Sequence, residues 1–94
     1  MRYTIHESKT AQAQLARLWL QADAAGRRAI TQASHRADQV LTSASAPTAG
    51  VSCPRPGLPT LRCLDSGPIV VEFVFMPSFQ EVQVMGYHLA PWRP

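Results

Sequence analysis

The sequence predicts an α+β protein with the element order β-α-α-β-β-β, in which a two-helix hairpin packs on one face of a small sheet. Two observations predict this class. Residues 8–44 carry two stretches of apolar residues at helical spacing, and residues 60–89 show the apolar runs and alternation typical of strands. The chain has only 94 residues, which fits a single domain over 1–94 and leaves no room for a second.

A short strand over Tyr3–His6 is predicted to open the chain, followed by a helix. Ser8 or Thr10 is a suitable cap, because a hydroxyl accepts hydrogen bonds from the first free amides of a helix. Apolar residues then follow on one helix face: Ala11, Leu15, Leu18, Trp19 and Ala22. We expect this stripe, including Trp19, to lie in the core.

A break over Asp23–Gly26 is predicted to separate this helix from a second one, for which Asp23 is a candidate cap. The second apolar stripe consists of Ile30, Ala33, Ala37, Val40, Leu41 and Ala44. Because the break is short, the two helices are expected to form an antiparallel hairpin. Solvation is the expected role of its outer polar residues, Arg27, Arg28, Gln32, Arg36 and Gln39.

Proline and glycine interrupt the helical pattern after Leu41. Residues 42–59 hold four prolines and two glycines, so a helix cannot continue there. We expect a loop over about 45–59. A loop of this length in a small domain is typically functional or mobile, and Arg55 lies within it between two prolines.

The last third is predicted to consist of strands. Thr60–Leu64 forms a short strand, and residues 65–68 form a turn. Ile69–Met76 is apolar on both faces, as expected for a central strand, and Glu81–Leu89 alternates like a half-exposed one. We expect these three strands to form an antiparallel meander. The first strand joins its edge, so that the sheet is mixed at that strand.

Composition and charge exclude several classes of protein. No apolar run is long enough for a transmembrane helix, and the N-terminus lacks the apolar region of a secretory signal, so a cytoplasmic protein without membrane contact is expected. The net charge of +3 is compatible with a nucleic-acid or acidic-protein partner. Clustered Lys and Arg are missing, which disfavours a standalone nucleic-acid binder.

Cys53 and Cys63 are the only cysteines. They lack CxxC spacing and clustered histidines, so they make neither a zinc site nor a disulfide framework. We expect reduced thiols, and we predict neither a metal nor any other cofactor.

The order of elements, the chain length and the spacing of short motifs resemble the RelE/ParE superfamily of bacterial toxins from type II toxin–antitoxin modules, a class that includes plasmid-stabilisation systems. The resemblance covers residues 1–89. The motifs that carry it are residues 1–5 (MRYTI) with 15–20 (LARLWL), 37–41 (ADQVL), 61–64 (LRCL) leading into 67–74 (GPIVVEFV), and 82–88 (VQVMGYH).

This resemblance implies a target and a partner. Toxins of the RelE type cut messenger RNA on the ribosome, and those of the ParE type inhibit DNA gyrase. Both are neutralised by an antitoxin that wraps the toxin, so a cognate antitoxin is the expected partner. The second sheet face carries Val70, Val74 and Met76, which favours an interface with an antitoxin segment or with a second copy in a homodimer. Trp92 and Arg93, in the tail over 90–94, are either a partner anchor or a frayed end.

The resemblance also implies candidate catalytic residues. Metal-free RNA cleavage needs an activated 2′-OH, a cation for the phosphorane and an acid for the leaving oxygen. The matching regions of this chain offer Arg55, Arg62, Tyr87 and His88. Histidine titrates near neutral pH, which suits an acid or base. Arg62 could instead pair with Glu72 or Glu81 across strands.

Two parts of the sequence, one on each of two predicted strands, depart from the ribonuclease pattern. Val70 and Val71 stand where such relatives tend to carry Arg, and Met85 and Gly86 stand where they tend to carry Lys or Arg. Losing one such charge-stabilising donor can reduce a rate on the order of a hundredfold. The sequence therefore predicts reduced cleavage, and the alternative is a catalytically degenerate RelE/ParE-like binding protein.

Overall fold

The computed structural model describes residues 2–43 and 46–92, and its elements confirm the predicted α+β class. In chain order they are β1 (Thr4–Glu7), α1 (Lys9–Gln21), α2 (Ala24–Thr42), β2 (Val51–Ser52), β3 (Arg62–Ser66), β4 (Ile69–Met76) and β5 (Glu81–Leu89), with 3-10 helices at Ala46–Thr48 and Pro77–Phe79. Ala44 and Arg93 lie outside the described residues.

The strands form one five-stranded sheet in the order β1-β5-β4-β3-β2. β1 runs parallel to β5, and all other pairs are antiparallel, so the mixed sheet and the meander were correctly predicted. β2 was not predicted. Val51 and Ser52 pair with Cys63 and Arg62 of β3 inside the segment expected to be a loop, because a two-residue strand is too short to produce a readable alternation.

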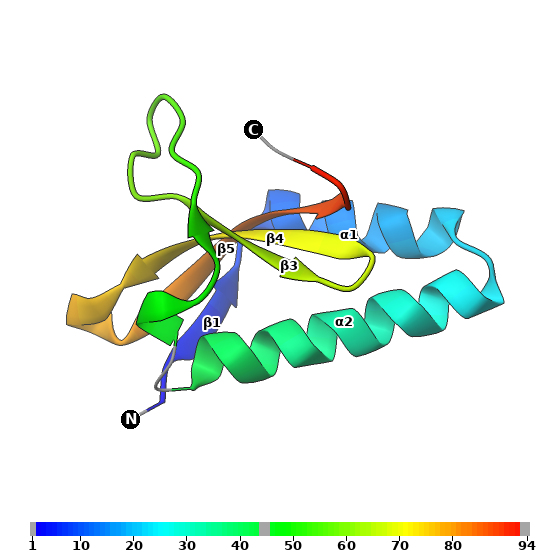
Figure 1. Ribbon diagram of the computed structural model, residues 1–94, viewed down its shortest axis with the longest axis horizontal. Coiled ribbons are helices and arrows are strands. Elements are labelled where there is room, and N and C mark those ends of the chain that lie inside the picture. Colours follow the sequence, from blue (N-terminus) through cyan, green and yellow to red (C-terminus); the bar gives the residue numbers. More distant parts are fainter. Residues whose placement is uncertain (1, 44–45, 93–94) are drawn as a thin grey trace.

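Both helices begin at capped positions. The Ser8 hydroxyl accepts a hydrogen bond of 3.0 Å from the Ala11 amide, and the Asp23 carboxylate accepts one of 2.8 Å from the Gly26 amide. The hairpin covers one face of the sheet, and Figure 1 shows α2 running along the sheet on that side. The main core lies between these two layers; its fully buried members include Ala11, Ala33, Leu41, Ile69, Phe73, Val82 and Val84.

Trp19 does not lie in the core, contrary to the expectation from the helical stripe. Its side chain is 40% exposed, and the guanidinium of Arg27 lies 4.4 Å from its ring centroid. Arg27 also donates hydrogen bonds to the carbonyls of Trp19 and Leu20 at the end of α1. Arg27 therefore closes the hairpin instead of being merely solvated, and Trp19 packs beneath it at the surface.

A smaller core lies on the opposite face of the sheet. Cys53, Leu61, Cys63 and Val70 are buried there, and Leu58, Val74, Met85 and Trp92 pack against them. Figure 1 shows that the segment between β2 and β3 and the end of the chain both lie on the side of the sheet away from α2. The face expected to be a free apolar interface is thus covered in part by the chain's own loop, and Val70 is fully buried.

The expectation of two reduced cysteines was wrong, because Cys53 and Cys63 form a disulfide. Pairing of β2 with β3 places Val51 opposite Cys63, which brings the two cysteine Cα atoms to 6.2 Å. The sequence offered no signal for this contact, since it depends on the unpredicted strand β2.

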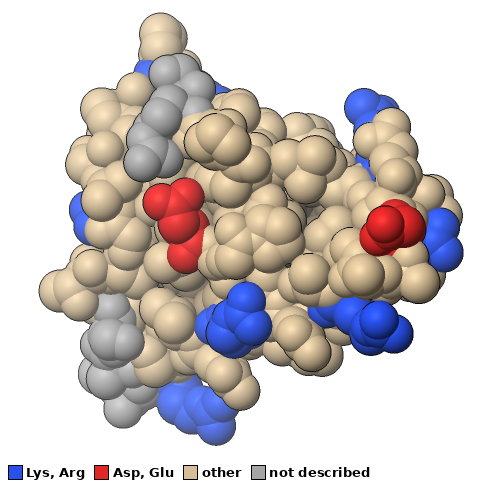
Figure 2. Space-filling model, turned by 45° about the vertical axis from the view of Figure 1, so that its right-hand side comes forward, with Lys and Arg blue, Asp and Glu red and all other residues tan. Residues whose placement is uncertain are grey.

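Across the described residues, no helix has both the length and the apolar character needed to span a bilayer. Figure 2 shows a face on which charged side chains are scattered among uncharged ones and form no continuous basic stripe.

Candidate functional site

A buried carboxylate lies at the centre of the sheet. Glu72 belongs to β4 and is only 1% exposed. Its neighbours Val71 and Phe73 face the helices, so Glu72 points to the opposite face, where Cys63 of β3 and Gly86 of β5 flank it across the strands. A charged residue at this depth requires partners, because burying an unpaired carboxylate is costly.

Arg55 and His88 supply these partners. Nη1 of Arg55 lies 2.6 Å from Oε2 of Glu72, and Nε2 of His88 lies 2.6 Å from Oε1. Each carboxylate oxygen therefore has its own nitrogen partner. The side chains of Arg55 and His88 are 37% and 21% exposed, so the cluster presents a guanidinium and an imidazole to solvent while the carboxylate orients both from below. We call this set, Arg55, Glu72 and His88, the Glu72 cluster.

Glycine at position 86 makes room for the Glu72 cluster. A Cβ atom at this position would lie 2.6 Å from Oε1 of Glu72, 2.9 Å from Oε1 of Gln14 and 3.3 Å from Nε2 of His88. The absence of a cation here, which the sequence marked as a departure from the ribonuclease pattern, therefore has a local structural reason: any side chain would displace the carboxylate.

Trp92 completes the surface beside the cluster. Its ring stacks on the His88 imidazole with centroids 3.7 Å apart and planes 6° from parallel. Trp92 is thus packed against its own chain and is not a frayed end. The other tail residue singled out from the sequence, Arg93, lies outside the described residues.

Arg62, predicted as a catalytic candidate, lies on the other face of the sheet. It is paired with Phe73 in the β3–β4 register and therefore shares the helix-side face. Its Nε and Nη2 atoms donate hydrogen bonds of 2.9 Å to the carbonyls of Ala49 and Gly50. The alternative pairing with Glu72 or Glu81 is also absent, since Glu72 binds Arg55 and Glu81 lies 3.3 Å from His6. Arg62 fixes the connection before β2.

The Tyr87 side chain also belongs to the helix side. It is 3% exposed and packs in the main core. Burial, together with the negative charge of Glu7, raises the pKa of its hydroxyl far above the usual range, so this phenol stays protonated. The four residues predicted as one catalytic set are therefore divided: the sheet brings Arg55 and His88 together and places the side chains of Arg62 and Tyr87 on the other face.

Glu72, the residue that joins Arg55 to His88, was missed as a site residue. A signal was present: it is the single charged residue in the apolar strand Ile69–Met76. Charged residues inside an otherwise apolar central strand are rare unless paired. Glu72 was therefore as strong a candidate for a site residue as Arg55.

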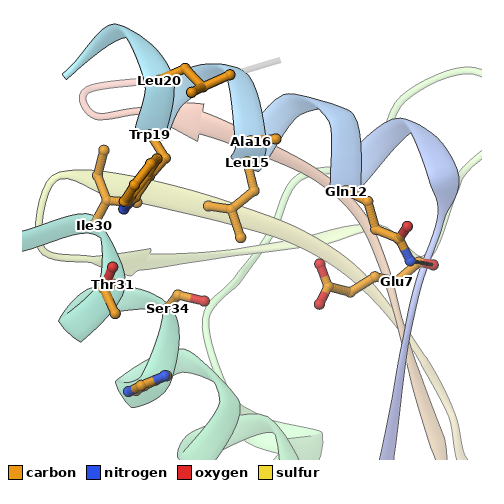
Figure 3. Close-up of a pocket in the computed structure, with 10 residues that line it drawn as sticks. Glu7, Gln12, Leu15, Ala16, Trp19, Leu20, Ile30, Thr31 and Ser34 are labelled. Carbon is orange, nitrogen blue, oxygen red and sulfur yellow. Dashed lines mark hydrogen bonds between the residues drawn. The ribbon is translucent and has the colours of Figure 1, made fainter. Parts of the chain in front are cut away.

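A second feature lies between the helices. A groove of about 530 Å³ is lined by residues of α1 and α2 and by Glu7. Figure 3 shows Leu15, Trp19 and Ile30 directed into it, with Gln12 and Glu7 at one end. Leu20 at its rim is 65% exposed. This groove is separated from the Glu72 cluster by the sheet. Among the described residues, no group of three or more His, Cys, Asp or Glu side chains is placed to hold a metal ion.

Comparison with known proteins identifies the fold. No protein-family model and no curated protein matches the sequence. Among solved structures, the chain is similar to one from the toxin–antitoxin complex RelBE2 of Mycobacterium tuberculosis, with a TM-score of 0.72, 15% identity, and coverage of 95% of this chain and 92% of that one. It is also similar to one from the chromosomal ParDE TA system of P. aeruginosa, with a TM-score of 0.65, 17% identity, and coverage of 94% and 96%. The protein therefore shares its fold with these two chains from toxin–antitoxin systems, as the resemblance to the RelE/ParE superfamily predicted.

Proposed function

We propose that this protein is the toxin of a RelE/ParE-like type II toxin–antitoxin module and that it inhibits growth by cleaving messenger RNA on the ribosome. The observation that carries the nuclease assignment is the Glu72 cluster, in which Arg55 and His88 are held 2.6 Å from one buried carboxylate. The fold, shared along 95% of the chain with a structure from a toxin–antitoxin complex, supports the toxin role.

The cluster supplies groups that RNA cleavage needs. Glu72 holds Nε2 of His88, which orients the ring and leaves Nδ1 as the nitrogen not engaged by this carboxylate. In the proposed reaction, His88 takes the proton of the 2′-OH. The 2′-oxygen then bonds to phosphorus, the bond to the 5′-oxygen breaks, and the leaving oxygen takes a proton from solvent. Arg55 stabilises the phosphorane charge.

A specific observation favours a second candidate, a RelE/ParE-like binding protein without nuclease activity. Both oxygens of Glu72 and one nitrogen of Arg55 are already engaged inside the chain. Such a cluster is satisfied without a substrate, and buried ion pairs also occur as purely structural features. Inhibition of DNA gyrase is a further candidate for growth arrest by such a protein.

Controlled expression in a bacterial host tests these candidates. Growth is followed together with separately labelled protein and DNA synthesis. If the nuclease proposal holds, protein synthesis fails first. Glu72→Gln, Arg55→Ala and His88→Ala each then reduce messenger cleavage by about a hundredfold. Arg28→Ala removes an exposed cation outside the cluster and leaves cleavage unchanged.

Other outcomes identify the competing functions. If DNA synthesis fails first, gyrase is the target. Arrest that survives all three cluster variants, at equal soluble protein, overturns the nuclease mechanism. Absence of arrest from the soluble wild-type protein favours the binding protein.

The antitoxin is expected to dock in the groove between α1 and α2. This surface exposes large apolar side chains, Leu20 at 65% and Trp19 at 40%, and a groove between helices accepts an amphipathic segment. Ala16→Arg would fill the groove lined by Ala16. It is expected to abolish neutralisation by the cognate antitoxin while leaving growth arrest intact. Neutralisation that persists would exclude the groove as the docking surface.

A further inference from the structure

Beside the Glu72 cluster, a cleft of about 400 Å³ opens between α1 and the end of β5. Three residues of α1 line it, Gln14, Arg17 and Leu18, and the other side is lined by Tyr87, His88, Leu89 and Trp92. The tryptophan that stacks on His88 thus forms part of the wall, and the imidazole that the proposed function uses lies at the boundary between cleft and cluster.

The cleft lies beyond the end of β1, where β5 has no further strand partner on that edge. β1 ends opposite Val84 of β5, and α1 then crosses the free edge. The Gln14 side-chain oxygen accepts a hydrogen bond of 2.9 Å from the Tyr87 amide, in place of a strand partner. One helical turn further on, Arg17 is exposed and forms no ion pair with any other described residue.

The lining chemistry fits an anion that carries a flat ring. The cleft offers a guanidinium, an imidazole, a side-chain amide and an indole, and it is lined by no carboxylate among the described residues. Guanidinium groups bind phosphate oxygens, and an aromatic side chain provides a surface for a nucleobase. An acidic peptide would satisfy Arg17 but would not use the indole wall.

We propose that this cleft is a nucleotide subsite, in which Arg17 binds a phosphate and Trp92 contacts the base of the nucleotide next to the 2′-OH that His88 deprotonates. This inference rests on the proposed ribonuclease function and names the substrate contacts of that same site. Gln14 acts as a positioning residue that holds β5 against α1 and so sets the distance between the Arg17 and His88 sides of the cleft.

Tryptophan emission of the full-length protein tests this subsite. The variant Trp19→Phe leaves Trp92 as the only tryptophan, and the variant Trp92→Phe leaves only Trp19. Titration with adenosine 3′-monophosphate is expected to change the emission of the first variant and not of the second. Within the Trp19→Phe protein, Arg17→Ala is expected to raise the Kd for this nucleotide about tenfold while leaving the Kd for adenosine unchanged. Arg28→Ala serves as the matched cation control.

The outcomes separate the subsite from the proposed function. The subsite is overturned if the nucleotide leaves Trp92 emission unchanged, if inorganic phosphate competes as well as the nucleotide does, or if Arg28→Ala weakens binding as much as Arg17→Ala. If binding fails while His88-dependent growth arrest persists, the function stands and the subsite is wrong. If the nucleotide binds with the expected dependence on Arg17 but no RNA is cleaved, the subsite stands and the ribonuclease assignment fails.

Discussion

The carboxylate of Glu72 occupies the space that a side chain at position 86 would need. The two residues face each other across β4 and β5, and a Cβ built on Gly86 would lie 2.6 Å from Oε1 of Glu72. Because this oxygen also binds His88 at 2.6 Å, the absence of a side chain at position 86 permits the contact on which the candidate site depends.

Gly86→Ala is therefore expected to lower the free energy of unfolding by about 1–3 kcal/mol, as overpacking of a filled interior does, and to weaken growth arrest. Urea unfolding of wild type, Gly86→Ala, Glu72→Ala and the double variant tests whether this loss of stability arises from the contact between the two residues. The penalty for Gly86→Ala should shrink by about 1 kcal/mol or more in the Glu72→Ala background, where the shortest of the contacts, that with Oε1 of Glu72, is removed. An equal penalty in both backgrounds would contradict the proposed contact.

Arg62 is expected to contribute to stability and not to cleavage. Its guanidinium donates to the carbonyls of Ala49 and Gly50 on the helix-side face of the sheet. Arg62→Ala should lower the free energy of unfolding by about 1–3 kcal/mol, since two carbonyls lose a charged donor. At a temperature where the variant remains folded, RNA cleavage per folded molecule should equal that of wild type. A loss as large as that of Arg55→Ala would return Arg62 to the catalytic set.

The disulfide is expected to stabilise the loop that carries Arg55. Cys53 and Cys63 are ten residues apart in sequence, and in the chain-entropy model, cross-linking a loop of that size contributes about 2–3 kcal/mol. Thermal unfolding with and without a dithiol reductant measures this contribution, and reduction should lower Tm. The variant with Cys53→Ser and Cys63→Ser is the control, because its Tm should not respond to the reductant. A reductant effect of equal size in that variant would show that the disulfide is not its source.

Asp38 is expected to make stability depend on pH. Burial raises its pKa, the charge of Glu7 raises it further, and His35 lowers it in part. A carboxyl with a raised folded-state pKa holds its proton more tightly in the folded state, so its contribution to stability is lost as pH rises from the ordinary carboxyl range through the raised pKa.

Asp38→Asn should therefore be more stable than wild type at about pH 7 and equally stable at about pH 3, where the carboxyl is protonated in both states. Urea unfolding across this range provides the measurement. Asp23→Asn, which keeps an oxygen at the α2 cap, is the control. A stability difference that does not vary with pH would exclude titration of Asp38 as the cause.

Local patterns were sufficient for most of the fold. The caps at Ser8 and Asp23, the apolar stripes of both helices and the bounds of β4 and β5 all follow from spacing and capping chemistry, which act within a few residues of the chain. Trp19 lies at the surface and not in the core, because the apolar stripe indicates only which side of a helix is apolar. How deeply the end of α1 is covered depends on the neighbouring helix.

The candidate site could be predicted only in part. Arg55 and His88 were singled out for their chemistry, but the grouping with Arg62 and Tyr87 was wrong in geometry. Adjacent strand residues point to opposite faces, so the face of each side chain depends on register, and the irregularity between Glu72 and Phe73 in the β4–β5 pairing alters that register locally. A pattern of residue types carries no information about such a shift.

The sequence by itself determined the order of the two helices and of every strand except β2, the hairpin and the central position of β4, because these depend on periodicity and turn chemistry along one segment at a time. Only the tertiary structure decided that β2 pairs with β3, that Cys53 meets Cys63, and that Glu72 joins Arg55 to His88 from 17 and 16 residues away. Contacts between distant segments are fixed by packing and register of the whole sheet, and no local pattern encodes which of the possible partners will meet.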